Sequence, residues 1–262
     1  MSMSWNIMTL LRSILLLPIY LFISFSCDGS NLGASGTIPV SHQVFDELLK
    51  KHVSKDGKVN YRGFIQEKER LEKYLKLLSE NPPDRVTWTK NQQLAYWINA
   101  YNAFTIQLIM DNYPVKSIQD LHPKLKIPMV NTVWHVKFFS IGGKETSLDE
   151  IEHQILRKEF NEPRIHFAIN CASFSCPPLL NEAYTSEKLE MQLENAARRF
   201  INDAKRNKLG KESIQISWIF SWFKSDFTKN TTLIEFLNKY ADSPIDANAK
   251  ISYLKYDWSL NE

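Results

Sequence analysis

The chain has 262 residues, of which 44% are hydrophobic and 23% are charged, and these fractions are ordinary for a folded globular protein. They exclude wholesale disorder and collagen-like structure, and the small number of glycines, eight, favours a helix-rich or mixed domain over a glycine-punctuated β-barrel. The net charge is +3, and the 32 basic residues are interleaved with 29 acidic ones. The sequence therefore has no basic block of the kind that binds nucleic acid.

The N-terminus has the pattern of an export signal. Residues 1–26 contain no acidic residue and a single base, Arg12, followed by an apolar run that ends in small residues. Cys27, directly after Ser26, is similar to the processing site of a bacterial lipoprotein, where the cysteine becomes the lipidated N-terminus. We therefore expect a signal peptide over residues 1–26, a lipid anchor at Cys27 and a flexible tether over residues 27–40. Ordinary cleavage near Ser26 and an uncleaved anchor are the alternatives.

This anchor would make the membrane a partner of the protein. It would place the chain in the bacterial cell envelope, facing the periplasm or the cell surface. Such a compartment also allows disulfides to persist.

The strongest predicted helix spans residues 89–110. It begins with a capping box between Thr89 and Gln92, and it is apolar almost all round, so we expect it to be the buried central helix. Asn99 and Asn102 lie three residues apart on one face. Because buried amides need partners, this face should meet other polar groups.

The remaining predicted elements are shorter and irregularly ordered. Further helices are expected over residues 41–53, 62–80, 147–160, 187–206 and 232–240. Short strands are expected over residues 58–61, 133–140, 164–171, 213–217 and 250–258. We therefore predict an α+β fold, a helix-rich single domain over residues 41–262 with a small, mostly antiparallel sheet.

Polar chemistry concentrates in residues 164–179. The predicted strand carries His166 and Asn170 on one face and ends at Cys171, and Cys176 follows a serine-containing turn, directly before two prolines. Because proline is favoured in the first turn of a helix, we expect Cys176 at a helix N-cap, where the backbone amides favour a thiolate. A nearby histidine would complete the arrangement of a cysteine nucleophile.

Five ordered blocks of sequence resemble one known family, the domain of unknown function 547. The blocks are Trp97–Thr105, Tyr113–Ile118, Ser147–Arg157, Pro163–Leu179 and Ile219–Phe227. Together they span about residues 85–230. The family occurs in bacterial secreted proteins and in plants and has no settled activity, so the resemblance implies a shared fold rather than a function.

Four hypotheses stay open for the cysteine pair. The spacing of Cys171 and Cys176 allows a disulfide if the turn brings their Cα atoms within about 7 Å. Alternatively, Cys176 and His166 form a thiol-based catalytic centre. A metal site would use both cysteines, His166 and either His153 or His135, although the C-x4-C spacing is looser than a usual zinc knuckle. Simple buried thiols are the fourth hypothesis.

The leading hypothesis is a thiol-dependent hydrolase or acyl transferase. Cys176 would be the nucleophile and His166 the base, and the orienting group would be one of Asn99, Asn170 and Glu152. The predicted substrate-binding residues are Asn102, His153, Arg157, Asn170, Cys171 and Ser175. We assign no cofactor, no bound metal and no nucleic-acid partner, and the ligand is a peptide, a glycan or a small molecule.

Two other functions are considered. The first is a non-enzymatic envelope module that binds a ligand and is stabilised by a Cys171–Cys176 disulfide. The second is a metal-dependent hydrolase.

Overall fold

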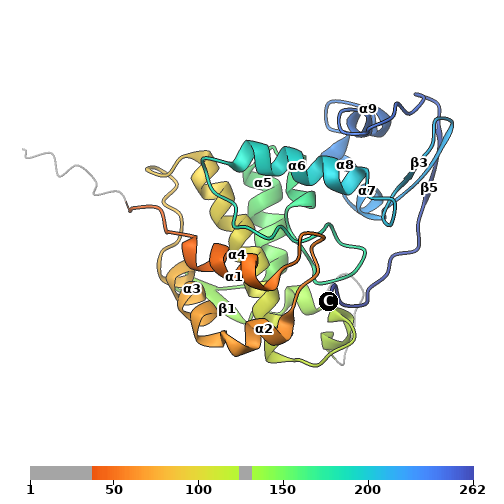
Figure 1. Ribbon diagram of the computed structural model, residues 1–262. Coiled ribbons are helices and arrows are strands. Elements are labelled where there is room, and N and C mark those ends of the chain that lie inside the picture. The colour runs from red at the N-terminus through yellow and green to blue at the C-terminus, as the bar shows by residue number, and fades with distance from the viewer. Residues whose placement is uncertain (1–36, 124–131) are drawn as a thin grey trace, which may run out of the picture. The chain divides into compact units, whose positions relative to one another are not determined.

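The computed structural model describes residues 37–123 and 132–262 (Figure 1). The expected signal peptide over residues 1–26 and the expected lipid attachment site Cys27 lie outside these ranges, and so does most of the expected tether. Among the described residues, no helix has both the length and the apolar character needed to cross a membrane.

Helix α4 (Lys90–Asp111) is the buried centre of the fold, as the sequence predicts. Both bonds of the expected capping box are present: Thr89 Oγ1 accepts from the Gln92 N–H at 3.2 Å, and Gln92 Oε1 accepts from the Thr89 N–H at 2.8 Å. Sixteen of the 22 residues of α4 are buried, so other elements cover the helix on nearly every side.

Three N-terminal helices pack beside α4. They are α1 (Gln43–His52), α2 (Tyr61–Gln66) and α3 (Lys68–Glu80). The single helix expected over residues 62–80 is thus divided in two at Glu67, which ends α2 and begins α3. Both α2 and α3 contact α4.

The strands are few and short, and they form two separate sheets. β1 (Phe139–Ile141) and β2 (Lys144–Thr146) are an antiparallel hairpin. In the second sheet, β4 (Ser213–Ile216) pairs antiparallel with β3 (Lys208–Leu209) and parallel with β5 (Lys250–Tyr253). The expected helix-rich α+β class is confirmed, and the strand expected over residues 250–258 is shorter than predicted. The strand expected over residues 133–140 is wrong for most of its length, because residues 133–135 form a 3-10 helix and only residues 139–140 lie in β1.

The strand expected over residues 164–171 is wrong. Pro163 instead opens a short 3-10 helix, η4 (Pro163–Phe167), and Glu162 Oε1 caps it by accepting from the Arg164 N–H at 3.1 Å. After η4, Ala168 O and the Asn170 N–H bond to the side-chain amide of Asn102 on α4 rather than to a neighbouring strand. The helix expected after Cys176 is also wrong, because the described residues between η4 and α6 (Leu189–Ile201) contain no helix. No strand forms over residues 58–61 either, where Val59 makes only an isolated bridge to Val53.

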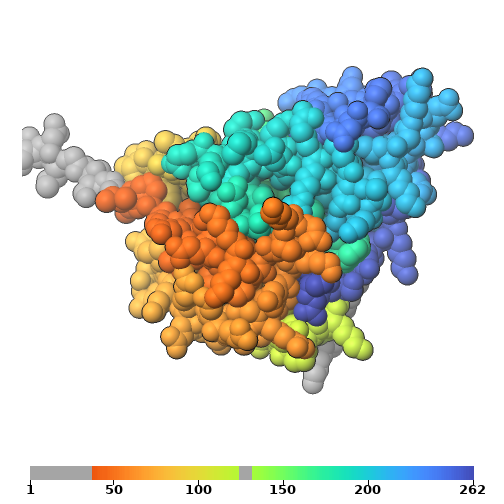
Figure 2. Space-filling model, in the orientation of Figure 1, coloured from red at the N-terminus to blue at the C-terminus, as the bar shows by residue number. Residues whose placement is uncertain are grey.

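The helix expected over residues 147–160 begins as a π-helix, η3 (Glu150–Leu156), and continues as α5 (Arg157–Glu159). The remaining helices are η1 (Ile118–Leu121), η2 (Val133–His135), α7 (Ile219–Trp222), α8 (Lys224–Phe227) and α9 (Leu233–Asn238). The C-terminal end of the chain returns to lie beside α2, where Asn261 O accepts from the Val59 N–H at 2.8 Å (Figures 1 and 2).

Candidate functional site

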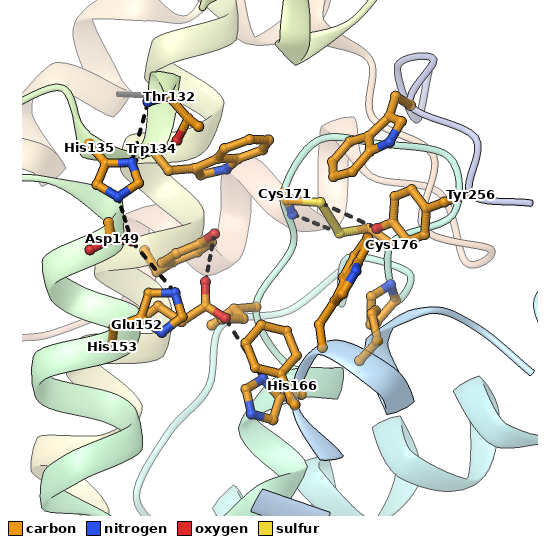
Figure 3. Close-up of a pocket in the computed structure, with 17 residues that line it drawn as sticks. Thr132, Trp134, His135, Asp149, Glu152, His153, His166, Cys171, Cys176 and Tyr256 are labelled. Atoms are coloured by element: carbon orange, nitrogen blue, oxygen red, sulfur yellow. Dashed lines mark hydrogen bonds and ion pairs between the residues drawn. A yellow bond between two sulfur atoms is a disulfide. The ribbon is translucent and has the colours of Figure 1, made fainter. Parts of the chain in front are cut away.

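A cavity of about 340 Å³ lies where α4, η2, η3, η4, α7 and the C-terminal segment meet (Figure 3). This volume lies within the range that small-molecule sites occupy. The lining side chains that carry polar, ionisable or sulfur atoms are Tyr101, Thr132, His135, Asp149, Glu152, His153, His166, Cys171, Cys176 and Tyr256.

Glu152 reaches the cavity from η3. The helix begins with a capping box, in which Ser147 and Glu150 exchange both hydrogen bonds at 3.1 Å. The wider turn of a π-helix is often found at functional sites. One oxygen of Glu152 lies 3.5 Å from the Tyr101 hydroxyl, and the other lies 3.8 Å from His166 Nδ1.

The pKa of Glu152 lies near neutral pH. Burial raises the pKa of Glu152 to about 7, and the negative charges of Asp149 and Asp226 act in the same direction, while Arg157 and Tyr101 oppose the shift. A carboxyl with such a pKa can act as a proton donor under ordinary conditions.

His166 is almost completely buried, with 2% of its surface exposed. Its Nε2–H donates to Asp226 Oδ2 at 2.8 Å, and its ring stacks on Phe223 at a centroid distance of 3.9 Å. Nδ1 has no hydrogen-bond partner among the described residues, because Glu152 at 3.8 Å is too far for one. Burial lowers the pKa of His166, and this outweighs the opposing effect of Asp226.

Asp226 is the group that orients His166. Arg157 holds the same carboxylate with two bonds, Nε to Oδ2 at 2.6 Å and Nη2 to Oδ1 at 2.9 Å. Burial alone would raise the pKa of Asp226, but the bonds from His166 and Arg157 bring it far below the usual value. The carboxylate therefore stays ionised and accepts the proton-bearing side of the imidazole.

A second group of titratable side chains, His135, Asp149 and His153, lies beside Glu152 in Figure 3. Asp149 Oδ1 lies between two imidazoles, 3.4 Å from His135 Nε2 and 3.5 Å from His153 Nε2. Arg157 Nη1 donates to His153 Nδ1 at 2.7 Å, which connects this group to Asp226. Among residues 37–123 and 132–262, however, no set of three or more His, Cys, Asp or Glu side chains has the geometry to hold a metal ion.

The two cysteines are joined by a disulfide, with their Cα atoms 6.2 Å apart. We call residues 171–176 the cysteine loop. Arg206 holds it from the end of α6, donating to Cys176 O and Phe174 O, each at 2.7 Å. The C-terminal segment holds its other side, where Ser259 O accepts from the Phe174 N–H at 2.7 Å. The loop is thus a fixed part of the cavity wall.

A comparison with protein families can be set beside this geometry. Residues 86–201 match the family described as "Protein of unknown function, DUF547". This part of the chain is a DUF547 domain. The resemblance found in the sequence is confirmed, although the match is shorter than the span of about residues 85–230 on which it was based. No curated protein and no solved structure matches the chain.

The DUF547 match contains only part of the cavity. Glu152, His166 and the cysteine loop lie within it, whereas Asp226 and the aromatic side chains of α7 and the C-terminal segment lie beyond residue 201. The orienting carboxylate and most of the aromatic wall are therefore supplied by the chain outside the family match.

The predicted site residues divide into two groups. The structure brings Glu152, His153, His166, Cys171 and Cys176 to the cavity, and it places Arg157 directly behind them. The structure also separates His166 from Cys176, the expected nucleophile, because the imidazole lies apart from the disulfide in Figure 3. The polar side chains that face the imidazole are instead Asp226 and Glu152.

Asn99 and Asn102, which the sequence predicts as site residues, do not line the cavity. Their side-chain amides instead join α4 to other backbone segments of the DUF547 match. Asn99 bonds to both Tyr184 O and the Tyr184 N–H, at 2.8 and 3.0 Å. Asn102 likewise bonds to Ala168 O at 3.0 Å and the Asn170 N–H at 2.9 Å.

Two further predicted site residues, Asn170 and Ser175, form hydrogen bonds that hold the cysteine loop. Asn170 bonds to Pro177 O and to the Ala172 N–H, each at 2.8 Å. Ser175 Oγ accepts from the Asp257 N–H at 2.9 Å. These side chains hold the loop in position, and neither of them lines the cavity.

Sequence reasoning missed several residues that line the cavity, and it also missed Asp226, which bonds to His166 but does not line the cavity itself. Asp226 is the most important, and its only signal was its place in the last block of the DUF547 resemblance. Tyr101, Asp149 and Tyr256 gave no signal of their own. Trp222 lies in the last block of the resemblance, Ile219–Phe227, whereas Trp134 and Trp258 gave no signal of their own.

Proposed function

We propose that the protein is a hydrolase in which His166 activates a water molecule and Glu152 protonates the leaving group. The observation that carries this proposal is the buried, unpartnered Nδ1 of His166, a residue that lines the cavity, together with the Nε2–H that Asp226 holds on the other side of the ring. A carboxylate on one ring nitrogen leaves the other with its lone pair, which is the arrangement of a general base.

His166 and Glu152 together take up and release every proton that such a cycle requires. His166 Nδ1 takes a proton from water as the oxygen attacks the substrate, and Glu152 gives its own proton to the departing oxygen or nitrogen. The products leave an imidazolium beside a carboxylate, and the two atoms are 3.8 Å apart. Proton transfer from His166 to Glu152 then restores both groups.

Water is the nucleophile in this proposal because the disulfide leaves no free thiol. The thiol-dependent reaction expected from the sequence would need a reduced Cys176. The reaction class stays the same, namely hydrolysis of an acyl group from an ester or amide. The Tyr101 hydroxyl, 3.5 Å from Glu152, is a donor that can face the carbonyl oxygen of such a substrate.

A matched set of variants tests the proposal. The full chain is assayed against a panel of 4-nitrophenyl esters and anilides, together with Glu152→Gln and His166→Gln. The glutamine in His166→Gln can still donate to Asp226 but cannot accept a proton. Glu145→Gln, an exposed change on β2, is the control. Each cavity variant should lose at least about 100-fold in kcat/KM, as is typical when a general acid or base is removed, whereas the control should not change.

Two outcomes would contradict the proposal. The first is hydrolysis that both cavity variants retain at the rate of the control. The second is the absence of any turnover above that of buffer across the panel, which would favour a binding module instead.

We also propose that this hydrolase is exported and held on a membrane by a lipid at Cys27. The support is the leader pattern of residues 1–26 and the cysteine that follows it.

A further inference from the structure

A series of aromatic rings runs from the cavity to the protein surface. We call Trp134, Trp258, Trp222, Trp218 and Tyr253 the aromatic track. Within the cavity, Trp134 and Trp258 lie 5.7 Å apart between ring centroids, and Trp222 stacks on Trp258 at 5.8 Å. The series continues outside the cavity, where Trp218 lies 6.4 Å from Trp222 and stacks on Tyr253 at 5.0 Å.

The outer members of the aromatic track are exposed. Trp222 exposes 46% of its surface and Trp218 exposes 38%, whereas Trp88 exposes only 4%. Large aromatic side chains usually bury most of their surface, so contiguous exposed rings beside a cavity mark a binding surface. Since Trp222 lines the cavity and Trp218 does not, the track extends the site beyond the cavity itself.

The opposite side of the cavity is polar and acidic. Asp149, Glu152, His135 and His153 come from η2 and η3 and lie together in Figure 3. Carboxylates and imidazoles accept hydrogen bonds from hydroxyl groups. The Asp149 carboxylate also disfavours an anionic ligand such as a nucleotide or a phospholipid headgroup.

From these two walls we infer that the substrate is a carbohydrate that carries the acyl group, and that it is an oligosaccharide rather than a single sugar. This inference rests on the proposed hydrolase function. A sugar ring offers a face of C–H groups, which suits the flat tryptophans, and a rim of hydroxyls, which suits the carboxylates. The cavity of about 340 Å³ is small, and the exposed rings of Trp222 and Trp218 provide stacking surfaces for the sugar units that extend from it.

Binding can be measured separately from hydrolysis in the Glu152→Gln variant. The full-length variant is titrated by calorimetry with a tetramer of N-acetylglucosamine, with an O-acetylated xylo-oligosaccharide and with N-acetylglucosamine itself. At least one acylated oligosaccharide should bind, and it should bind at least about tenfold more tightly than the single sugar because it gains the outer stacking contacts.

Trp218→Ala, added to this variant, distinguishes the track from the cavity. It should weaken oligosaccharide binding about tenfold and leave single-sugar binding unchanged, because Trp218 lies outside the cavity. Met191→Ala, which removes another exposed apolar side chain, is the control and should change neither.

The outcomes separate the inference from the function on which it rests. If no acylated oligosaccharide binds, or if Trp218→Ala has no effect on one that does, the carbohydrate inference is wrong, even where ester hydrolysis still depends on Glu152. If the oligosaccharide binds through Trp218 but wild-type protein never releases its acyl group, the binding surface is correct and the hydrolase function is wrong.

Discussion

His166 has two ring nitrogens in different surroundings, and this difference gives the residue its proposed chemistry. Nε2 lies 2.8 Å from Asp226 Oδ2 and donates to it, whereas Nδ1 has no hydrogen-bond partner in the described part of the chain. An ionised carboxylate can only accept, so it fixes the proton on Nε2. Leaving a buried polar atom unpaired costs free energy, and a ligand or water at Nδ1 would remove that cost.

Glu152 is expected to make folding stability depend on pH. Its folded-state pKa of about 7 lies above the ordinary value of 4.5, so the folded protein binds more protons between these values than the unfolded chain does. The contribution of Glu152 to the free energy of unfolding should therefore fall as the pH rises from about 4.5 to 7. Glu152→Gln cannot ionise, so its advantage over wild type should grow by up to about 3 kcal/mol across that range.

Urea unfolding at several pH values measures this difference. Glu145→Gln, which changes an exposed carboxyl, should follow the wild-type curve. Parallel stability curves for wild type and Glu152→Gln would contradict a raised pKa at this residue.

At the scale of elements, the cysteine loop joins segments that are far apart in the chain. Ala172 has a positive φ of 59°, which a non-glycine residue seldom adopts, and Asn170 stabilises this turn by accepting the Ala172 N–H. Arg206 and the C-terminal segment hold the rest of the loop. The disulfide therefore closes a loop that already has many supports.

Replacing both Cys171 and Cys176 by alanine should reduce stability and preserve activity. Removing a cross-link that closes so short a loop should lower the free energy of unfolding by about 2 kcal/mol. Ester hydrolysis at a temperature where the variant is folded should stay close to wild type, because neither sulfur is the nucleophile. Loss of hydrolysis in the folded variant, or in Cys176→Ala alone, would instead favour the thiol-dependent mechanism.

The elements that the sequence predicts correctly have local causes. For α4, a capping box and an apolar surface on all sides are sufficient to predict a buried helix. The alternation of residues 164–171 predicts a strand, but Ala168 O and the Asn170 N–H bond instead to the side-chain amide of Asn102 on α4, and no local pattern specifies that contact. His166 and Glu152 were found because polar residues gather near them. Asp226 was not, because it lies 60 residues from His166 along the chain.

At the scale of the whole molecule, the cavity needs more than the DUF547 domain. The polar wall comes from residues inside the match over 86–201, and most of the aromatic wall comes from α7 and the C-terminal segment. Members of the family that lack these later segments are therefore expected to differ in their ligands.

The proposed lipid anchor gives a prediction for the intact chain. When the full chain is expressed in a bacterium, it should be recovered with membranes, and mass spectrometry should find an N-terminus at Cys27 that carries acyl chains. Cys27→Ser should move the protein out of the membrane fraction. An unmodified Met1 or Cys27 in membrane-extracted protein would contradict the anchor.

The most direct test of the account is the protonation state of His166 in the wild-type protein. Nitrogen-15 NMR of the histidine rings at pH 7, with His166→Gln used to assign the signal, distinguishes the two neutral tautomers and the charged form. We predict a neutral ring with its proton on Nε2 and a pKa below the ordinary 6.5. A proton on Nδ1, or a charged imidazolium at pH 7, would leave no general base at the cavity and would contradict the proposed mechanism.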